Sequence, residues 1–250
     1  MKLISLLEKL EYTCLQGSTD QEVKNVIYDS RKVEEGSLFI CIRGAVVDGH
    51  KFVPDVVAKG AKVLIVEEAV EAPEDVTVIL VKDTRYAMAF ISAAYFGYPA
   101  EKLKTIGITG TKGKTTTTYM VKSILENAGY KVGLIGTIEA IIGDKVIPAK
   151  NTTPESYVIQ EYFHEMAEAG CDCVVMEVSS QGLMLHRTAG FVFDIGIFTN
   201  LEPDHIGPNE HKDFADYLHC KALLFKQCKT GIFNADDQHL EEILEGHTCE

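Results

Sequence analysis

The sequence contains no apolar window long enough to span a membrane, and no secretory signal opens the chain. Its seven cysteines form no CxxC pair, and Cys171 and Cys173 are separated by a single residue. Scattered thiols of odd number fit buried packing in a reducing cytosol better than disulfides or a zinc site. Internal repeats and low-complexity tracts are also absent. These absences favour a cytoplasmic globular protein.

Positive charge is also scarce. The 250 residues include 24 Lys and Arg against 37 Asp and Glu, which gives a formal net charge of −13. This balance argues against non-specific nucleic-acid binding. An anionic ligand would need a local basic pocket, built from residues such as Arg31, Lys112, Lys114 and Arg187. A hydrophobic content of 46% is enough for a real core, and the length fits one large domain or two ordinary ones.

Residues 104–118, KTIGITGTKGKTTTT, carry the strongest functional pattern of the chain. They predict a buried strand, a turn over residues 110–113 and a helix, and such a turn points backbone N–H groups at a phosphate. Lys114 can reach the outer phosphates, and the Thr115 hydroxyl can bind Mg²⁺. The common phosphate-loop pattern has glycine where Ile108 stands, so this is a variant. A glycine- and threonine-rich turn without any ligand is the alternative.

The first hundred residues mix short helical and strand patterns. We expect helices over 1–10, 51–59 and 84–96, and strands over 22–27, 37–42, 63–66 and 76–81. The sequence Gly97-Tyr98-Pro99 marks a domain boundary near residues 98–103. We therefore place a small mixed α/β domain at 1–101 and a second domain at 102–250.

Strand and helix patterns alternate in the second half. Thr153 is expected to cap a helix that begins at Pro154. The expected strands are 105–109, 131–135, 173–178, 193–199 and 231–233, with a hairpin over 138–147, and the expected helices are 115–128, 154–169, 213–228 and 238–244. This alternation predicts an α/β fold with a parallel sheet covered by helices on both faces.

Polar residues follow three of the expected strands. They are the phosphate loop, the sequence EVSS at 177–180 and the sequence NLEPDH at 200–205. Ligands of open parallel sheets lie outside the carboxyl ends of the strands, so these groups would meet at one edge, where a nucleoside triphosphate and Mg²⁺ would bind. Glu177 is then a plausible Mg²⁺ ligand.

Three other residues have ordinary interpretations when they are taken alone. His205 fits a surface hydrogen-bonding residue as well as a functional one. Arg187 fits a surface ion pair as well as an anion-binding residue. Lys221, on the expected helix 213–228, reads as a solvent-facing lysine from composition.

The motifs in combination resemble those of the Mur ligases. Within that family they are most similar to the branch that adds the third amino acid of the peptidoglycan stem. The residues that carry the resemblance are DSRKVEEGSLFICIRG at 29–44, DGHKFV at 48–53, GTKGKTT at 110–116, NTTPE at 151–155, EVSSQGL at 177–183, HR at 186–187, TNLEPDH at 199–205 and CKALLF at 220–225.

The resemblance implies a role for each matching position. The ATP loop would comprise Gly110, Thr111, Lys112, Gly113, Lys114, Thr115 and Thr116, and the substrate contacts Ser30, Thr152, Thr153, Ser179 and Arg187. Glu177 and His205 would serve at the metal site with Thr115. Lys221 matches the lysine that the family carbamylates with CO₂, and the carbamate would hold a second Mg²⁺. Carbamylation needs a lysine whose pKa is lowered by desolvation. The family often has glutamine two positions before the arginine, and Leu185 stands there.

The implied reaction is ATP-dependent amide ligation with Mg²⁺ as the metal. A terminal carboxylate of UDP-N-acetylmuramoyl-L-alanyl-D-glutamate would take the γ-phosphoryl group and form an acyl phosphate, which the amine of meso-diaminopimelate or L-lysine would attack. Catalysis would then be mostly positioning and electrostatics, with Lys114, Glu177, His205 and Lys221 as the catalytic residues. The segment 204–211 is slightly more similar to lysine-adding members.

The family also has a C-terminal domain that binds the amino acid and completes the ATP site. The sequence stops at Glu250, soon after NADD at 234–237. We therefore expect an N-terminal portion that lacks ligase activity alone, with uncovered apolar surface at a shortened sheet. A non-catalytic nucleotide-binding module and a phosphoryl-transferring kinase are the alternatives, and the apparent UDP-sugar domain argues against the kinase.

Overall fold

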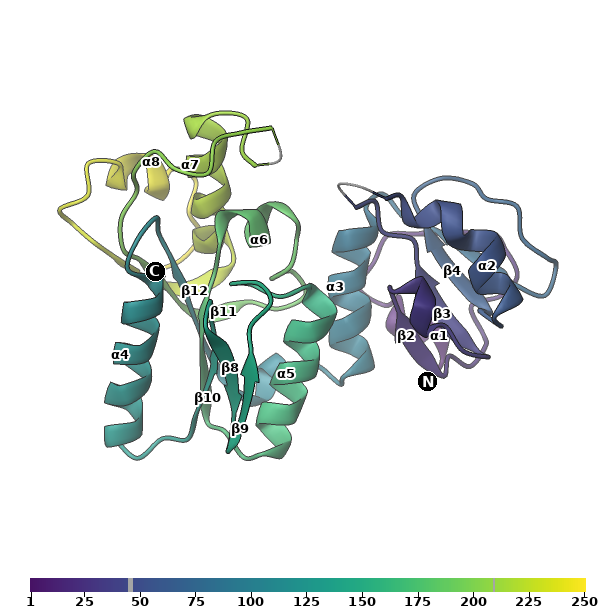
Figure 1. Cartoon of the computed structure of the whole chain (residues 1–250), viewed down its shortest axis with the longest axis horizontal. Coiled ribbons are helices and arrows are strands. Elements are labelled where there is room, and N and C mark those ends of the chain that lie inside the picture. The colour runs from purple at the N-terminus through teal and green to yellow at the C-terminus, as the bar shows by residue number, and fades with distance from the viewer. Residues whose placement is uncertain (45–46, 209) are drawn as a thin grey trace. The chain divides into compact units, whose positions relative to one another are not determined.

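The computed structural model describes residues 1–44, 47–208 and 210–250. The chain forms two compact units, Met1–Tyr95 and Phe96–Glu250, which Figure 1 shows in one view. Residues 96–101, which the sequence pattern assigns to the first domain, belong to the second unit in this division because η3 (Pro99–Lys102) packs against α5 (Ser156–Glu168). No helix in the described part of the chain is long and apolar enough to cross a membrane.

The first unit contains a five-stranded sheet. Its strand order is β1-β5-β4-β3-β2, with bounds Thr13–Gln16, Thr77–Leu80, Val63–Val66, Ser37–Ile40 and Asn25–Ile27. Strands β2 to β5 run parallel, and β1 pairs antiparallel with β5. The helices are α1 (Leu3–Leu6), η1 (Ser30–Lys32), η2 (Gly49–Phe52), α2 (Val53–Ala58) and α3 (Thr84–Tyr95).

Two features of this unit differ from the sequence patterns. The helix expected over 1–10 is the single turn α1, which has no side-chain cap at Lys2 and is held by packing against α3. The sequence patterns do not predict strand β1, because its residues are mostly exposed and show no apolar alternation. Its pairing with β5 joins segments about sixty residues apart, which local patterns do not report.

The second unit contains a seven-stranded sheet. Its strand order is β12-β11-β6-β10-β7-β8-β9, with bounds Cys228–Phe233, Phe193–Phe198, Lys104–Thr109, Cys173–Glu177, Val132–Ile135, Glu139–Ile142 and Lys145–Pro148. The first five strands in this order are parallel, and the hairpin β8–β9 continues the sheet antiparallel. The predicted α/β fold with a parallel sheet is confirmed.

Helices cover both faces of this sheet, as Figure 1 shows for α4 (Lys114–Asn127) and α5. Val174 and Met176 of β10 share a core cluster with Phe163 of α5. Val175 lies on the other face, in the cluster against which Val121 of α4 packs. The remaining helices are α6 (Ser180–Met184), α7 (Phe214–Ala222), η4 (Leu223–Lys226) and α8 (Leu240–Leu244).

The predicted helix start at Pro154 is wrong. Helix α5 begins at Ser156 and has Glu155 in the N-cap position. The side chain of Thr153 is used elsewhere: its Oγ1 donates to the carbonyl of Glu177 at 3.0 Å and accepts from the N–H of Ser179 at 2.9 Å. This residue therefore ties the start of α5 to the carboxyl end of β10.

The helix expected over 213–228 is also shorter than predicted. It is α7 followed by the 3-10 turn η4, and Cys228 already belongs to β12. The apolar run of residues 222–225 continues the helical pattern past the point where the chain tightens to enter the strand. The pattern therefore fixes the helix but not its end.

Candidate functional site

The glycine loop, residues 110–113, joins the end of β6 to the first residue of α4. Gly110 has φ +150°, and a Cβ there would lie 1.9 Å from Thr199 Oγ1. Gly113 is the N-cap of α4 with φ +80°. Gly110 therefore requires glycine for both space and conformation, whereas at Gly113 the conformation alone favours glycine.

Backbone N–H groups of the loop fall into two sets. The N–H of Thr111 donates to Asn200 O at 2.8 Å, and that of Lys112 donates to Asn200 Oδ1 at 2.9 Å. The first intrahelical bond of α4 runs from Thr117 N to Gly113 O, so the amides of residues 114–116 have no acceptor within the helix. These amides, including that of Thr116, are the ones that can meet a phosphate.

Lys114 folds back onto the loop. Its Nζ donates to Gly110 O at 2.8 Å and to Thr111 O at 3.0 Å. Burial lowers its pKa, while the charges of Glu177 and Asp204 act in the opposite direction. This ammonium is held by two neutral carbonyls and has no counter-charge in direct contact among the described residues, so a phosphate oxygen would be a stronger partner.

Glu177 ends β10 and is 1% exposed. Thr115 Oγ1 donates to its Oε2 at 3.0 Å, and Thr137 Oγ1 donates to the same oxygen at 3.1 Å. The N–H of Thr137 donates to Oε1 at 2.8 Å. A buried carboxylate beside a threonine hydroxyl, at the mouth of a glycine loop, is an oxygen donor set that suits Mg²⁺.

Lys221 is buried rather than solvent-facing, so the ordinary interpretation of this lysine is wrong. It is 2% exposed, and its Nζ donates to Gly110 O at 2.8 Å. The Nζ also lies 4.5 Å from the centroid of the Tyr217 ring. Burial, helped by the nearby charge of Lys114, lowers the pKa of Lys221 well below its ordinary value. The lowered pKa favours the neutral, nucleophilic form of this amine.

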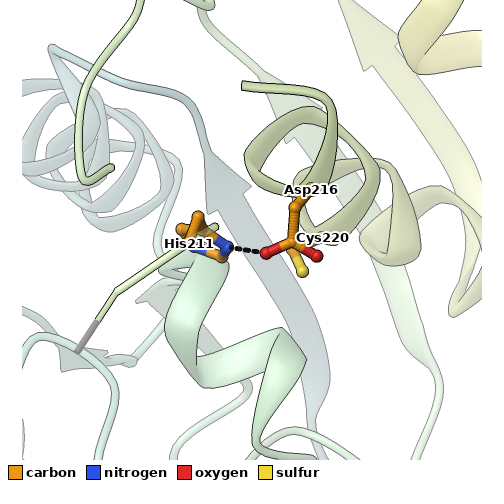
Figure 2. Close-up of side chains that lie close together, drawn as sticks. All are labelled: His211, Asp216 and Cys220. Carbon is orange, nitrogen blue, oxygen red and sulfur yellow. Dashed lines mark hydrogen bonds and ion pairs between the residues drawn. The ribbon is translucent and has the colours of Figure 1, made fainter. Parts of the chain in front are cut away.

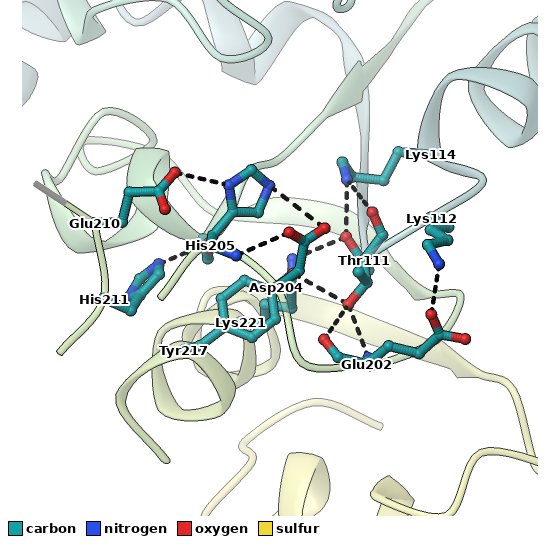
Figure 3. A network of polar contacts seen from close by, with 12 residues as sticks. Thr111, Lys112, Lys114, Glu202, Asp204, His205, Glu210, His211, Tyr217 and Lys221 are labelled. Carbon is teal, nitrogen blue, oxygen red and sulfur yellow. Dashed lines mark hydrogen bonds and ion pairs between the residues drawn. The ribbon is translucent and has the colours of Figure 1, made fainter. Parts of the chain in front are cut away.

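Tyr217 links the glycine loop to α7. Its hydroxyl lies 3.0 Å from Thr111 Oγ1, which in turn donates to Glu202 O at 3.2 Å and accepts from Glu202 N–H. Figure 3 shows Tyr217, Thr111 and Lys221 gathered beside the loop, with Lys112 paired to the Glu202 carboxylate. The sequence motifs do not single out Tyr217. It precedes Lys221 by four residues, and this helical spacing is the signal that could have found it.

His205 follows β11 in a left-handed conformation, with φ +53°. Its Nδ1 lies 3.1 Å from Glu210 Oε1, and its Nε2 lies 4.0 Å from Asp204 Oδ2. The ring is about half exposed, and its centroid is 6.0 Å from that of Tyr217. His205 and Lys221 thus flank the same tyrosine, whereas Thr115 and Glu177 are in direct contact with each other.

A cavity of about 350 Å³ lies in the second unit, next to the glycine loop. Its lining includes Lys114, Lys150 and Arg187, and Glu210 is the one acidic side chain among its described lining residues. The lining also provides Thr152, Thr153, Ser179 and His205. This excess of positive charge favours an anionic ligand in a chain that is strongly acidic as a whole.

Arg187 has both a fixed position and a spare donor. Its Nη1 donates to Thr153 O at 3.0 Å, and its Nη2 lies 2.9 Å from Glu155 Oε1. Its buried Nε has no hydrogen-bond partner among the described residues. Ser179 Oγ accepts from the N–H of Gly182 at 3.0 Å, and Thr152 Oγ1 lies 3.0 Å from Thr137 Oγ1. The structure therefore brings four of the five predicted substrate residues together.

Ser30 lies in the first unit, as the first residue of η1. Its carbonyl accepts from Lys59 Nζ at 2.8 Å. The preceding Asp29 caps η1, and hydrogen bonds from Arg31 lower the pKa of Asp29 to about 2. This segment is a polar turn with one tightly held carboxylate, and it leaves the Ser30 side chain half-buried.

Comparisons with known proteins identify the family of the chain. Residues 108–250 match the family model described as Mur ligase middle domain, and residues 22–96 match the one described as Mur ligase family, catalytic domain. The chain is 50% identical over 244 residues to UDP-N-acetylmuramoyl-L-alanyl-D-glutamate–2,6-diaminopimelate ligase of Clostridium perfringens, covering 98% of the chain and 50% of that protein. The Bacillus licheniformis ligase of the same name is 43% identical over 247 residues, covering 95% and 50%.

Solved structures show the same fold. A structure of a UDP-N-acetylmuramoyl-L-alanyl-D-glutamate–2,6-diaminopimelate ligase superposes with a TM-score of 0.82 at 24% identity, covering 98% of the chain and 49% of that protein. A MurF structure from Acinetobacter baumannii gives 0.66 at 23% identity, covering 98% and 51%. The chain thus spans about half the length of the curated relatives it matches. With a family model over more than half of its residues, the chain belongs to the Mur ligase family.

Proposed function

We propose that this chain forms the UDP-sugar-binding and ATP-binding portions of a ligase that adds an amino acid to UDP-N-acetylmuramoyl-L-alanyl-D-glutamate. The observation that carries the proposal is the contact between Thr115 and Glu177 at the mouth of the glycine loop, beside a cation-lined cavity. The printed names of the relatives support this substrate. The N-terminal domain would bind the uridine nucleotide through Ser30, and the second domain would act as the ATPase.

The donor set fits ATP with Mg²⁺. Thr115 and Glu177 would hold the metal ion, which in this chemistry offsets the negative charge of the phosphoryl oxygens. Lys114 would leave the loop carbonyls for the outer phosphates, and the free amides of residues 114–116 would cradle them. His205 is the further metal ligand that the family resemblance assigns.

The cavity would bind the carboxylate that becomes activated. Arg187 and Ser179 would hold the anionic end of the peptide. Thr152 and Thr153 would contact the peptide where it approaches the glycine loop. The carboxylate oxygen would attack the γ-phosphorus, and the bond to ADP would break. The amine would then attack the acyl carbon and release phosphate. Positioning in a charged, partly enclosed site supplies the rate enhancement, because no side chain needs to be a covalent nucleophile.

Lys221 fits the carbamate that the resemblance assigns to it. The side chain is buried, its pKa is lowered, and its Nζ lies against the glycine loop at Gly110 O. As a carbamate it would present oxygen to the same region, where a cation could bind. Cytoplasmic location follows from this function, since the cell's ATP and nucleotide-activated sugars are there.

The added amino acid is proposed to be 2,6-diaminopimelate. The relatives at 43–50% identity carry that name, which outweighs the slight similarity of segment 204–211 to lysine-adding members. Asn209 of that segment lies outside the described residues. Joining this chain to the C-terminal half of the Clostridium perfringens relative should give ADP release that depends on diaminopimelate. Release that depends only on L-lysine would reverse the assignment.

Binding of MgATP to the chain tests the metal site proposed at Thr115 and Glu177. Glu177→Gln removes the charge but keeps the shape, and it should weaken MgATP binding at least about tenfold in calorimetry, since a hydrogen bond to a charged group contributes ~1.5–3 kcal/mol. Glu139→Gln is the matched control, because Glu139 accepts from Tyr119 OH outside the glycine loop. Equal MgATP affinity in native and Glu177→Gln chains would contradict the proposed metal site.

A further inference from the structure

Three side chains form a hydrogen-bonded series at the wall of the cavity. Asp216 Oδ2 lies 3.0 Å from His211 Nδ1, and His211 Nε2 lies 2.8 Å from Ser180 Oγ. His211 is 0% exposed and Ser180 4%, and both line the cavity. Figure 2 shows the contact of His211 with Asp216 on α7. The series joins α7, the segment before it and the first residue of α6.

In a neutral His211 ring, the series assigns a position to each proton. As a carboxylate, Asp216 accepts hydrogen bonds and cannot donate them, so His211 carries its single ring proton on Nδ1. Its Nε2 is then a bare acceptor, and the hydroxyl of Ser180 must donate to it. The proton of Ser180 is thereby used inside the protein. The group that Ser180 can still offer a ligand is an oxygen lone pair.

The backbone around His211 holds this arrangement in place. The N–H of His211 donates to His205 O at 3.0 Å, and His211 O accepts from Gly207 N–H at 3.1 Å. Asp216 N–H is capped by Asp213 Oδ1 at 2.8 Å. The imidazole therefore cannot turn away from Ser180 without breaking the connection that leads into α7.

The neighbouring Ser179 has the opposite polarity. Its Oγ accepts from Gly182 N–H, so the hydroxyl proton is the group it can offer a ligand. Arg187 lies nearby and has a spare Nε donor. Ser179 and Arg187 thus suit an anion, and Ser180 suits a hydrogen-bond donor.

We propose that Ser180 accepts a hydrogen bond from the peptide amide N–H of the ligand, and that Asp216 sets this polarity through His211. The proposal rests on the proposed function, in which the ligand is a muramoyl dipeptide with an amide next to its carboxylates. A neutral N–H suits the site better than an ammonium, because Lys114, Lys150 and Arg187 outnumber the one described acidic lining residue, Glu210. Ser180 would be the contact residue, and His211 and Asp216 positioning residues.

A metal ion is the competing occupant of this corner. The Sγ of Cys220 and the ligand atoms of His211 and Asp216 all lie within 4.8 Å of one another. A cation between them would have to replace the hydrogen bond of His211 with Asp216 and remove the thiol proton. Burial, together with Asp216, raises the pKa of Cys220 to about 11, which opposes that loss.

The tautomer can be measured directly in this chain. Two-dimensional ¹⁵N NMR of histidine-labelled protein, assigned with His211→Gln, should show His211 with a protonated Nδ1 and a bare Nε2. Asp216→Asn should move some or all of the proton to Nε2, because an asparagine amide can donate to Nδ1. Glu242→Gln is the matched control, since it changes a histidine–carboxylate contact at His239. A proton on Nε2 in the native chain would overturn the proposal. So would Zn²⁺ binding that Cys220→Ser abolishes.

Ligand binding tests the contact itself. In calorimetry, the native chain should bind UDP-N-acetylmuramoyl-L-alanyl-D-glutamate about tenfold more tightly than the analogue whose alanyl–glutamyl amide is an ester, which lacks the N–H. Ser180→Ala should bind the amide and the ester equally well. Asp216→Asn keeps the serine and should reduce the preference for the amide over the ester. Circular dichroism melting would show that the variants are folded.

The outcomes separate the two proposals. Equal binding of amide and ester by the native chain, or an undiminished preference in Ser180→Ala, would overturn the role of Ser180 and leave the proposed function standing. Failure of the native chain to bind the dipeptide at all would overturn the proposed function, and the role of Ser180 with it.

Discussion

The ammonium group of Lys221 has two partners, the carbonyl of Gly110 and the ring of Tyr217. Both favour the charged form, the ring through its quadrupole. Burial and the charge of Lys114 oppose them, and the net effect is a lowered pKa. Lys221 is therefore held in place as a lysine while its proton is weakly bound, and both properties suit a residue that is to be modified at nitrogen.

We expect Lys221 to be carbamylated by CO₂. Chain incubated with ¹³C-bicarbonate near pH 8 should give a carbamate resonance in ¹³C NMR. Because the pKa of Lys221 is lowered, its neutral amine persists at pH values where surface lysines are protonated, and the signal should fade as pH falls through the lowered pKa.

Lys221→Arg should remove the carbamate signal, since arginine stays protonated. Lys229→Arg is the control, because Lys229 is exposed and paired with Asp194. A signal of equal strength in Lys221→Arg would rule out the carbamate at this position. In an active ligase, Lys221→Ala should be partly rescued by a short added carboxylate, and full activity without one would contradict the role.

The strand–loop–helix element formed by β6, the glycine loop and α4 depends on two glycines that are constrained in different ways. Gly110 is enclosed, with Thr199 Oγ1 and the backbone of Asn200 close to the position of a Cβ. At Gly113, no atom of the described residues beyond its chain neighbours lies within 4 Å of that position. Substitution at Gly110 therefore meets both strain and a clash, whereas substitution at Gly113 meets strain alone.

Gly110→Ala should lower the free energy of unfolding by about 2–3 kcal/mol, and Gly113→Ala by about 1 kcal/mol, as strained backbone and steric overlap predict. Urea unfolding measures both. Gly110→Ala should also lose MgATP binding, because Asn200 would be pushed off the amides of Thr111 and Lys112. Equal destabilisation by the two variants would show that the contacts of Gly110 do not constrain the loop.

Local patterns predict this element well and other parts of the site poorly. The strand, glycine turn and helix lie within a few residues of one another, so composition and periodicity report them directly. Lys221 reaches Gly110 across 111 residues, and Tyr217 reaches Thr111 across 106. No local pattern reports such contacts, and only the family resemblance singled out Lys221. The same reason explains the wrong helix start predicted at Thr153. Its side chain bonds to the carboxyl end of β10 and does not cap α5.

At the scale of the whole molecule, the proposed substrate residues fall in both units. Ser30 belongs to Met1–Tyr95, and the glycine loop and the cavity belong to Phe96–Glu250. Each unit has its own sheet and its own buried core clusters. Two independently built units should bind their ligands through separate sets of contacts, so damage to one site should leave the other site usable.

Paired substitutions test this division with ligands that each occupy one site. Lys114→Ala should weaken MgATP binding at least about tenfold, since it removes a charge-assisted contact to phosphate, and should leave UDP binding within about twofold of native. Ser30→Ala should weaken UDP binding and leave MgATP binding unchanged. UDP is the probe because the complete muramoyl dipeptide would also reach the cavity, which Lys114 lines. If Lys114→Ala weakened both ligands equally in calorimetry, with the native melting temperature retained, the assignment of uridine to the first unit and of ATP to the second would be wrong.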